Sequence, residues 1–202
     1  MLAEFEEPYH GRPLTYGEIG CFMSHYNIWQ DMVARDLQTV LILEDDIRFE
    51  AFFIQKLEHL MKELKSKPEQ WDLVYIGRKI LHNSQEDLVD DSEQLVYVDY
   101  TYWTLGYIIT RAGADKLLSA GALGQMVPVD EFLPIMYNRH PNTTWAHHFN
   151  NRSVQPSSDF YIFYSWGRRD RVRDTEFILK RIRVLRKLLK GYVGKLPFGD
   201  TY

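Results

Sequence analysis

Residues 39–46 read TVLILEDD, in which five β-prone residues lead into three consecutive acids, Glu44, Asp45 and Asp46. Adjacent carboxylates repel one another and are costly to desolvate, so folding alone gives no reason for the cluster. The apolar run predicts a buried strand, and open α/β sheets bind ligands at the carboxyl ends of their strands. The triplet therefore favours a site for a cation or for substrate hydroxyls over the alternative of a solvated acidic turn.

The spacing of the three acids predicts a division of roles among them. Glu44 and Asp46 alternate on an extended backbone, so both side chains are expected to point to the same side and to share a divalent cation. Hard cations such as Mg²⁺ and Mn²⁺ prefer oxygen ligands, and they often use only one or two protein carboxylates together with substrate phosphates. Asp45 is expected to face the other way, toward a ribose, a sugar hydroxyl or a structural donor.

The bulk composition is that of one globular domain. The chain has 202 residues, of which 45% are hydrophobic and 14% aromatic, which is enough for a substantial core. No apolar run approaches about 20 residues, and the first residues lack the basic and apolar regions of a signal peptide. The single cysteine, Cys21, excludes an internal disulfide and any zinc site built from several cysteines.

The charge is divided unevenly along the chain. Residues 168–202 hold 11 Lys and Arg against 4 Asp and Glu, whereas the rest of the chain holds 13 against 24. Nucleic acid is therefore not an expected partner of the body, because duplex binding needs basic surface. Residues 177–191 predict a basic amphipathic helix within a tail, 166–202. This tail could dock on the acidic body, which is the simplest interpretation, or on an anionic membrane surface or a partner's groove.

Apolar spacing and capping signals predict alternating helices and strands. Thr15 and Glu18 form a capping box that predicts a helix extending to about Arg35. The pattern then predicts, in order, a strand at 39–43, a helix over 52–64, strands at 73–76, 95–98 and 102–110, and a helix at 112–120. This order indicates an α/β sandwich with a mainly parallel sheet flanked by helices, in one domain over 1–165.

A second acidic pair, Asp130 and Glu131, lies in the apolar, proline-containing stretch MVPVDEFLP at residues 126–134. Such surroundings suit a general base that takes a proton from an acceptor hydroxyl. A helix N-cap formed by Asp130 explains the pair equally well.

Two further groups have a structural and a functional interpretation. On the first helix a pairing of Cys21 with His25 for nucleophilic catalysis lacks a third group to orient it, so packing is the better explanation of the thiol. Tyr100, Tyr102 and Trp103 could wall a sugar site by stacking, although aromatic strands more often belong to the core.

Five segments carry a resemblance, nearly continuous over roughly residues 8–156, to glycosyltransferase family 25 and within it to the animal procollagen galactosyltransferases. They are GRPLTYGEIGCFMSHYNIW (11–29), VLILEDDIRFE (40–50), WDLVYIGRK (71–79), YWTLGYIIT (102–110) and MVPVDEFLPIMYNRHP (126–141).

The resemblance implies a GT-A-type, Rossmann-like fold and transfer of galactose from UDP-galactose to hydroxylysine of collagen, with Mn²⁺, in the lumen of the endoplasmic reticulum. It places Glu44, Asp45 and Asp46 in the family's metal and diphosphate motif, which agrees with Glu44 and Asp46 at the metal and Asp45 at the donor. It places Asp130 and Glu131 in the acidic motif of the acceptor side, where one of the two is expected to be the base of an inverting transfer. It also places Glu18 and His25, with Ser24, in the signature beside the donor site. A non-catalytic binding or adhesion module and a lipopolysaccharide-type sugar transferase of the same family are the alternatives.

The chain also departs from the family pattern. The family begins further upstream, so the fold is expected to be truncated at its N-terminal side and to lack half of the nucleotide site. A Pro-Thr-His-Tyr segment of the family, with a histidine suited to a metal, corresponds here to residues 161–164, YIFY. The family's retention signal is absent from the end of the chain.

Overall fold

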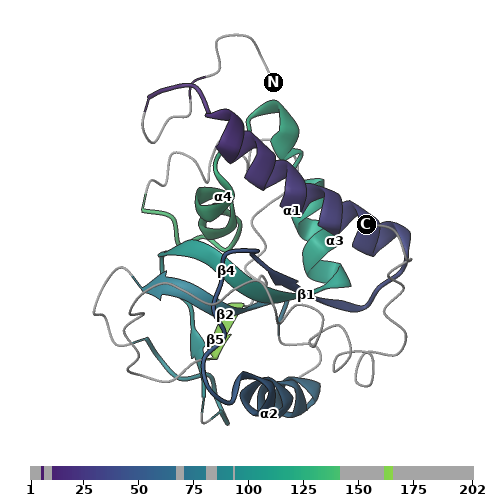
Figure 1. Ribbon diagram of the computed structural model, residues 1–202, viewed down its shortest axis with the longest axis vertical. Coiled ribbons are helices and arrows are strands. Elements are labelled where there is room, and N and C mark those ends of the chain that lie inside the picture. The colour runs from purple at the N-terminus through teal and green to yellow at the C-terminus, as the bar shows by residue number, and fades with distance from the viewer. Residues whose placement is uncertain are drawn as a thin grey trace.

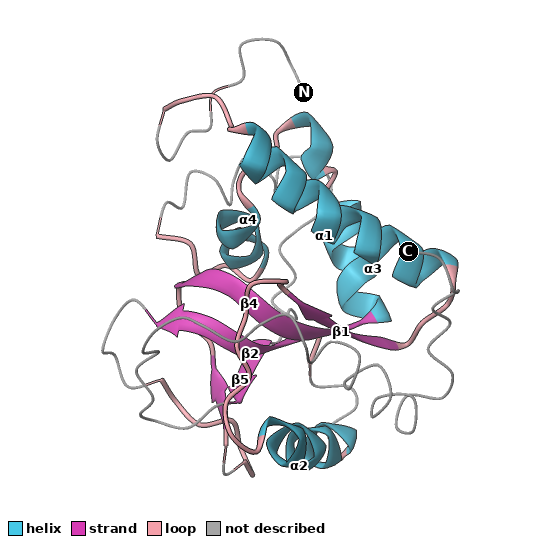
Figure 2. Ribbon diagram, viewed as in Figure 1, coloured by secondary structure: helices cyan, strands magenta, loops and turns pink. Residues whose placement is uncertain are grey.

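The computed structural model describes residues 6, 11–66, 71–80, 86–92, 94–141 and 162–165. Helices cover both faces of one sheet in three layers, as Figures 1 and 2 show. The helices are α1 (Tyr16–Ala34), α2 (Phe53–Lys65), α3 (Arg111–Ser119) and α4 (Val129–Met136), with a 3-10 turn at Ala122–Gly124. The strands are β1 (Thr39–Leu43), β2 (Leu73–Ile80), β3 (Leu95–Tyr97), β4 (Thr101–Thr110) and β5 (Ile162–Ser165).

The described strands form a five-stranded sheet in the order β1-β4-β2-β5-β3. Strand β4 pairs antiparallel with β1 and with β2, and β3 pairs antiparallel with β5. Only β2 and β5 pair in parallel within this sheet. The α/β class is therefore right, whereas the expected mainly parallel sheet is wrong for the part of the chain described.

The error has a definite physical origin. Strands β1 and β2 run in the same direction, because both lie antiparallel to β4, and helix α2 connects them as in a parallel βαβ unit. The later strand β4 is inserted between them, so the two never become hydrogen-bonded neighbours. Apolar periodicity predicts where a strand lies in the chain, but it does not predict which strand lies next to it.

The larger core lies on the face of the sheet that carries α1, α3 and α4. Its fully buried aromatic residues come from α1, α4 and β4, and edge contacts join Phe22 to Trp29 and to Phe132 at centroid distances of 6.2 and 5.3 Å. Tyr75 and Tyr107 contribute from the sheet. This packing holds the N-terminal helix against the end of the sheet where the acidic motifs lie.

Helix α2 packs on the opposite face. Its buried residues Leu57, Leu60 and Leu64 meet Val74 and Ile108, which alternate along their strands with residues of the other core. Alternate strand residues point to opposite faces, so a sheet covered on both sides reads as a continuous apolar run. That is the pattern in TVLIL and in YIIT.

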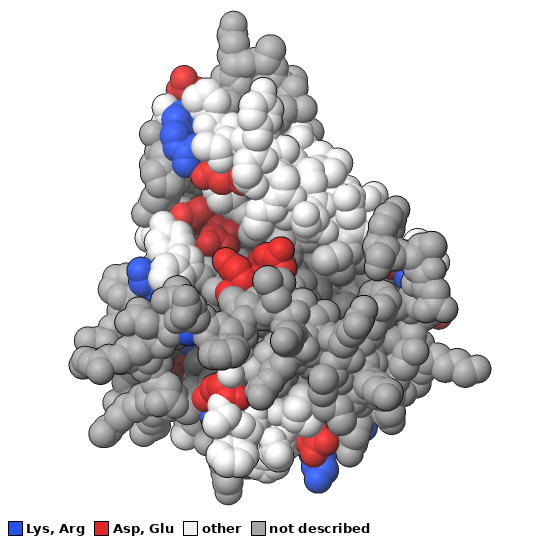
Figure 3. Space-filling model, in the orientation of Figure 1, with Lys and Arg blue, Asp and Glu red and all other residues white. Residues whose placement is uncertain are grey.

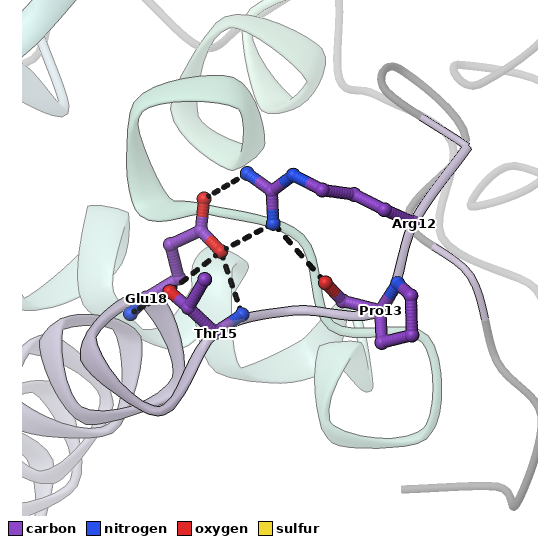
Figure 4. A network of polar contacts seen from close by, with 4 residues as sticks. All are labelled: Arg12, Pro13, Thr15 and Glu18. Atoms are coloured by element: carbon purple, nitrogen blue, oxygen red, sulfur yellow. Dashed lines mark hydrogen bonds and ion pairs between the residues drawn. The ribbon is translucent and has the colours of Figure 1, made fainter.

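The start of α1 is fixed by the predicted capping box. The Thr15 hydroxyl accepts from the Glu18 amide at 3.2 Å, and a Glu18 carboxylate oxygen accepts from the Thr15 amide at 2.8 Å. Arg12 adds a two-point ion pair to the same carboxylate at 2.7 and 2.9 Å, as drawn in Figure 4. The capping box is confirmed, and the helix ends at Ala34, close to the predicted Arg35.

Several predictions fall outside the described residues. The predicted tail 166–202 is one of them, so the boundary near residue 165 stays a prediction. Two N-x-[ST] glycosylation sequons, at Asn142 and Asn151, and the adjacent histidines His147 and His148 also belong to residues that the structure does not describe. Of the helices that are described, none combines the length and the apolar character needed to cross a membrane.

Candidate functional site

The acidic triplet follows β1 directly. Strand β1 ends at Leu43, and the Glu44 amide still donates to the carbonyl of Leu105 on β4 at 3.2 Å. Asp45 and Asp46 then form a turn and are exposed, whereas Glu44 is partly buried. The expected alternation of Glu44 and Asp46 on an extended backbone is therefore wrong, because the chain turns one residue after Glu44.

Glu44 is connected to the core by a line of hydrogen bonds. Its Oε1 lies 2.7 Å from Nε2 of His25 on α1. The other ring nitrogen of His25, Nδ1, lies 2.8 Å from the hydroxyl of Tyr107 on β4, and Trp29 donates its indole N–H to the same hydroxyl at 3.0 Å. The four side chains form one continuous network, which we call the Trp29–Glu44 relay.

The relay defines the tautomer of His25. The indole N–H of Trp29 is only a donor, so the Tyr107 oxygen accepts from it and directs its own proton to the remaining partner, Nδ1 of His25. Burial raises the pKa of Tyr107 well above its usual value, so the hydroxyl keeps that proton. Nδ1 is then an acceptor, and the His25 proton resides on Nε2 and is donated to Glu44. Both ring nitrogens are thus engaged within the protein.

Cys21 lies one helical turn before His25, beside the same carboxylate. The ligand atoms of Cys21, His25 and Glu44 lie within 4.8 Å of one another. Burial, and to a smaller extent the negative charges of Glu44 and Asp130, raise the pKa of the Cys21 thiol to about 11. The thiol is therefore protonated near neutral pH, which disfavours it as a nucleophile or metal ligand.

The donor set at this place fits a hard cation through oxygen. His25 is poorly suited as a ligand: a metal on Nε2 would move its proton to Nδ1, and the buried Tyr107 hydroxyl would lose its acceptor. Carboxylates of Glu44, Asp45 and Asp46 supply the oxygen chemistry that Mg²⁺ and Mn²⁺ prefer. Carboxylates that bind metals are usually held in place by hydrogen bonds of their own, and His25 provides such a bond to Glu44.

Asp130 lies in the first turn of α4 and is partly exposed. It accepts a short hydrogen bond from the Thr104 hydroxyl and one from the Trp103 amide at 3.3 Å, both on β4. The N-cap of α4 is Pro128, without a side-chain cap bond. The alternative in which Asp130 caps the helix is therefore wrong, since the carboxylate is directed to the neighbouring strand.

Glu131 occupies a different environment from its neighbour. It is 3% exposed and lies 2.7 Å from Nε2 of His140, and it accepts from the Tyr100 hydroxyl at 2.9 Å. Burial raises the pKa of Glu131, but hydrogen bonds from His140, Tyr102 and Tyr100 more than offset this, so the net pKa is lowered. A buried, ionised and fully paired carboxylate is a weak base, so Asp130 is better placed to receive a proton from substrate.

The two acidic motifs, whose first residues Glu44 and Asp130 lie 86 positions apart in the chain, meet near Cys21. Glu44 and Asp130 both act electrostatically on its thiol, and β4 residues 103–105 contact both motifs. Figure 3 shows acidic side chains gathered on one face, between α1 and the sheet, with few basic ones among them. The carboxylate of Glu18 is occupied by Arg12 and Thr15, whose hydrogen bonds lower its pKa to about 2.

Three residues of this site escaped the sequence analysis. Tyr107 and Thr104 lie in a strand whose aromatic and β-branched content indicates only a core strand, and His140 follows α4 in a loop. The hydroxyl groups of Thr104 and Tyr107, in a strand otherwise rich in apolar residues, are the signal that the sequence offers. A buried hydroxyl needs a hydrogen-bond partner, so these two residues indicate polar groups nearby.

A family model described as "Glycosyltransferase family 25 (LPS biosynthesis protein)" matches residues 1–133. The chain belongs to glycosyltransferase family 25. The match includes α1, the acidic turn and Asp130, so both motifs of the site lie within the family region.

Curated relatives of this family 25 chain support the assignment. It is 49% identical to "Procollagen galactosyltransferase 1" of Danio rerio over 87% of the chain, and 48% identical to "Glycosyltransferase 25 family member" of Drosophila melanogaster over 87%. It is also 48% identical to "Probable inactive glycosyltransferase 25 family member 3" of Bos taurus over 78%. The matches span 27–30% of the length of these relatives, so the chain corresponds to under a third of each.

Proposed function

We propose that this chain forms a metal-dependent sugar-transfer site of the inverting type, which moves galactose from UDP-galactose to hydroxylysine of collagen. Family membership supports a glycosyltransferase, and the printed names of relatives such as the Danio rerio protein support galactose as the sugar and procollagen as the acceptor. A GT-A-type arrangement agrees with the helix-covered sheet and with an acidic turn directly after a strand. An endoplasmic reticulum location would follow from a collagen acceptor.

The meeting of the two acidic motifs at residues 103–105 of β4, through printed hydrogen bonds to the Glu44 amide and the Asp130 carboxylate, is the observation that carries this proposal. A transferase needs a group that binds the leaving diphosphate on one side of the sugar and a base on the other side. The two acidic motifs supply these groups from different elements, the end of β1 and the start of α4. A solvated acidic surface would not require a buried relay behind one of its carboxylates.

On the donor side, we assign Glu44, Asp46 and Asp45 to a divalent cation and the UDP diphosphate. The cation would neutralise the charge that develops on the departing UDP. His25 engages Oε1 of Glu44, and we assign the second oxygen to the cation. His25 thus acts through Glu44 and not by direct contact with the donor, and Glu18 acts by fixing the start of the helix that carries His25.

On the acceptor side, Asp130 takes the proton of the attacking hydroxyl. The hydroxyl oxygen of the acceptor forms a bond to the anomeric carbon of galactose as the bond from that carbon to UDP breaks. Thr104 and the Trp103 amide hold the carboxylate in place. Glu131 anchors the start of α4 through Tyr100 and His140, so its role is to position Asp130.

Calorimetric titration of the chain with UDP, with and without Mn²⁺, tests this function. We expect UDP to bind only in the presence of Mn²⁺. Asp46→Asn and Glu44→Gln should each weaken this binding at least tenfold, whereas the matched control Glu58→Gln on α2 should leave it unchanged. If UDP does not bind in the presence of Mn²⁺, or if binding is unchanged in both variants, the chain is a non-catalytic relative.

A further inference from the structure

Trp103 is an exposed aromatic residue whose backbone amide contacts Asp130 of the site. It lies within strand β4, yet 49% of its surface is exposed. Its φ angle is +61°, a left-handed conformation that is unfavourable for any residue with a side chain and rare within a strand. Backbone strain of this kind is concentrated at functional sites, and at Trp103 it coincides with a contact to Asp130.

The surroundings of Trp103 provide a cation and a carboxylate. Its amide donates to Oδ2 of Asp130 at 3.3 Å. The Nζ of Lys79, on the neighbouring strand β2, lies 4.5 Å from the centroid of the indole ring. Ladder pairing of β2 with β4 is irregular here, with register shifts between Gly77 and Lys79. The irregular pairing coincides with an indole face that already binds an ammonium group.

We propose that the indole face of Trp103 binds the ammonium group of a lysine-type acceptor side chain, whose neighbouring hydroxyl then reaches Asp130. This inference rests on the proposed function and names the group that the acceptor side of the site recognises. The ammonium group of Lys79 lies over the Trp103 ring in the absence of acceptor, and the acceptor ammonium group displaces it on binding. Hydroxylysine carries its hydroxyl on the carbon adjacent to the aminomethyl group. This spacing suits a site in which the Trp103 ring binds the ammonium group and the Asp130 carboxylate, held by the Trp103 amide, receives the hydroxyl.

A structural role for Trp103 makes the opposite prediction for stability. If the indole served only packing, its removal would destabilise the fold. If the left-handed backbone is maintained at a cost for the sake of the ring, Trp103→Gly relieves the strain, because glycine adopts positive φ freely. Phe52 offers a matched control, since it is also left-handed, with φ of +63°, and 72% exposed, but it precedes α2 on the other face of the sheet.

The test measures binding of two synthetic Gly-X-Y peptides by calorimetry in the presence of UDP and Mn²⁺. One peptide contains hydroxylysine, and the other contains hydroxynorleucine, which keeps the hydroxyl and lacks the amine. For the first peptide we expect Trp103→Gly to weaken binding about tenfold, Trp103→Phe to weaken it less, and Lys79→Met to strengthen it severalfold. Phe52→Gly should leave it unchanged. The hydroxynorleucine peptide should bind weakly to every variant, with no effect of Lys79→Met.

The melting temperature of each variant completes the experiment. We expect Trp103→Gly to melt at or above the temperature of the unchanged chain. Equal binding of the two peptides, or unchanged binding in Trp103→Gly, overturns the inference even when UDP binds with Mn²⁺. If UDP itself does not bind with Mn²⁺, it is the proposed function that fails. A lower melting temperature of Trp103→Gly together with unchanged peptide binding assigns the indole to packing.

Discussion

The Nε2 of His25 lies 2.7 Å from Oε1 of Glu44, and this bond joins the middle of helix α1 to the end of strand β1. His25 is 4% exposed and has its second nitrogen on Tyr107, so its ring cannot rotate without breaking the relay. The orientation of Glu44 is therefore determined from inside the core, and the acidic turn has one carboxylate held rigidly beside two exposed ones.

We predict that His25→Phe weakens binding of UDP with Mn²⁺ about 10- to 100-fold, the usual cost of losing a partner behind a metal ligand. The aromatic ring keeps the packing but provides no donor for Glu44. Calorimetry provides the affinity, and His59→Phe on α2 is the matched control.

A double-mutant cycle makes this prediction specific. In a Glu44→Gln background, His25→Phe should cause little further loss, because the two residues act through one contact. Losses that simply add would contradict the assignment of His25 to the orientation of Glu44.

Asp130 and Glu131 should respond differently to neutralisation. We predict that Asp130→Asn lowers kcat for galactose transfer by a factor of about 10² to 10⁴, as expected for a general base, with less than about 1 kcal/mol change in the free energy of unfolding. Glu131→Gln should instead lower the free energy of unfolding by about 1–3 kcal/mol, because a buried donor loses its acceptor. Urea unfolding and initial rates separate the two, with Asp115→Asn on α3 as control.

The reactivity of Cys21 measures how close the two acidic motifs lie. Burial and the charges of Glu44 and Asp130 raise the pKa of this thiol to about 11, so alkylation by iodoacetamide at pH 8 should be slower than for a free thiol, whose pKa is about 8.5. Glu44→Gln and Asp130→Asn should each lower this pKa and accelerate alkylation. A pH–rate profile that is identical in Glu44→Gln, Asp130→Asn and the control Glu58→Gln would show that neither acid is near the thiol.

The start of α1 should confer a pH-dependent stability. Arg12 lowers the pKa of Glu18 from 4.5 to about 2, so the bonds of the ionised carboxylate contribute fully above pH 4.5 and are lost as the pH falls toward 2. Glu18→Gln should therefore cost about 0.2–1 kcal/mol of unfolding free energy at pH 6 and less at pH 3, the small magnitude reflecting a pair partly exposed to water. Urea unfolding at both pH values checks this. Asp31→Asn, which removes an exposed ion pair at the other end of α1, is the matched control. An equal cost of Glu18→Gln at both pH values would contradict the assignment.

Local elements were predictable because their signals are local. The capping box of Thr15 and Glu18, the limits of β1 and the strand of β4 follow from spacing within a few residues of sequence. The prediction of strand neighbours failed because β4 enters between β1 and β2 from a distant part of the chain. The turn at Asp45 was missed because an acidic residue after a strand is compatible with both extended and turn backbone.

The site was predictable as two acidic motifs but not as one arrangement. Sequence identified Glu44 and Asp130 from their flanking apolar residues, and it paired Asp130 with Glu131 as equivalent candidates. Their separation into an accessible and a buried carboxylate depends on His140 and Tyr100, which only the fold brings to Glu131. The role of Tyr107 likewise depends on the fold, which brings its hydroxyl to His25 and Trp29 on α1.

If the Glu44 motif holds a metal ion and UDP beside the base Asp130, Mn²⁺ bound in the presence of UDP will broaden the amide signals of both acidic motifs through its paramagnetism. With Mg²⁺ as the diamagnetic reference, we predict selective broadening of the amides of Glu44, Asp46, Cys21 and Asp130, while those of α2 stay sharp. Broadening centred on α2, or none at Mn²⁺ and UDP concentrations that saturate the chain in calorimetry, would contradict the account.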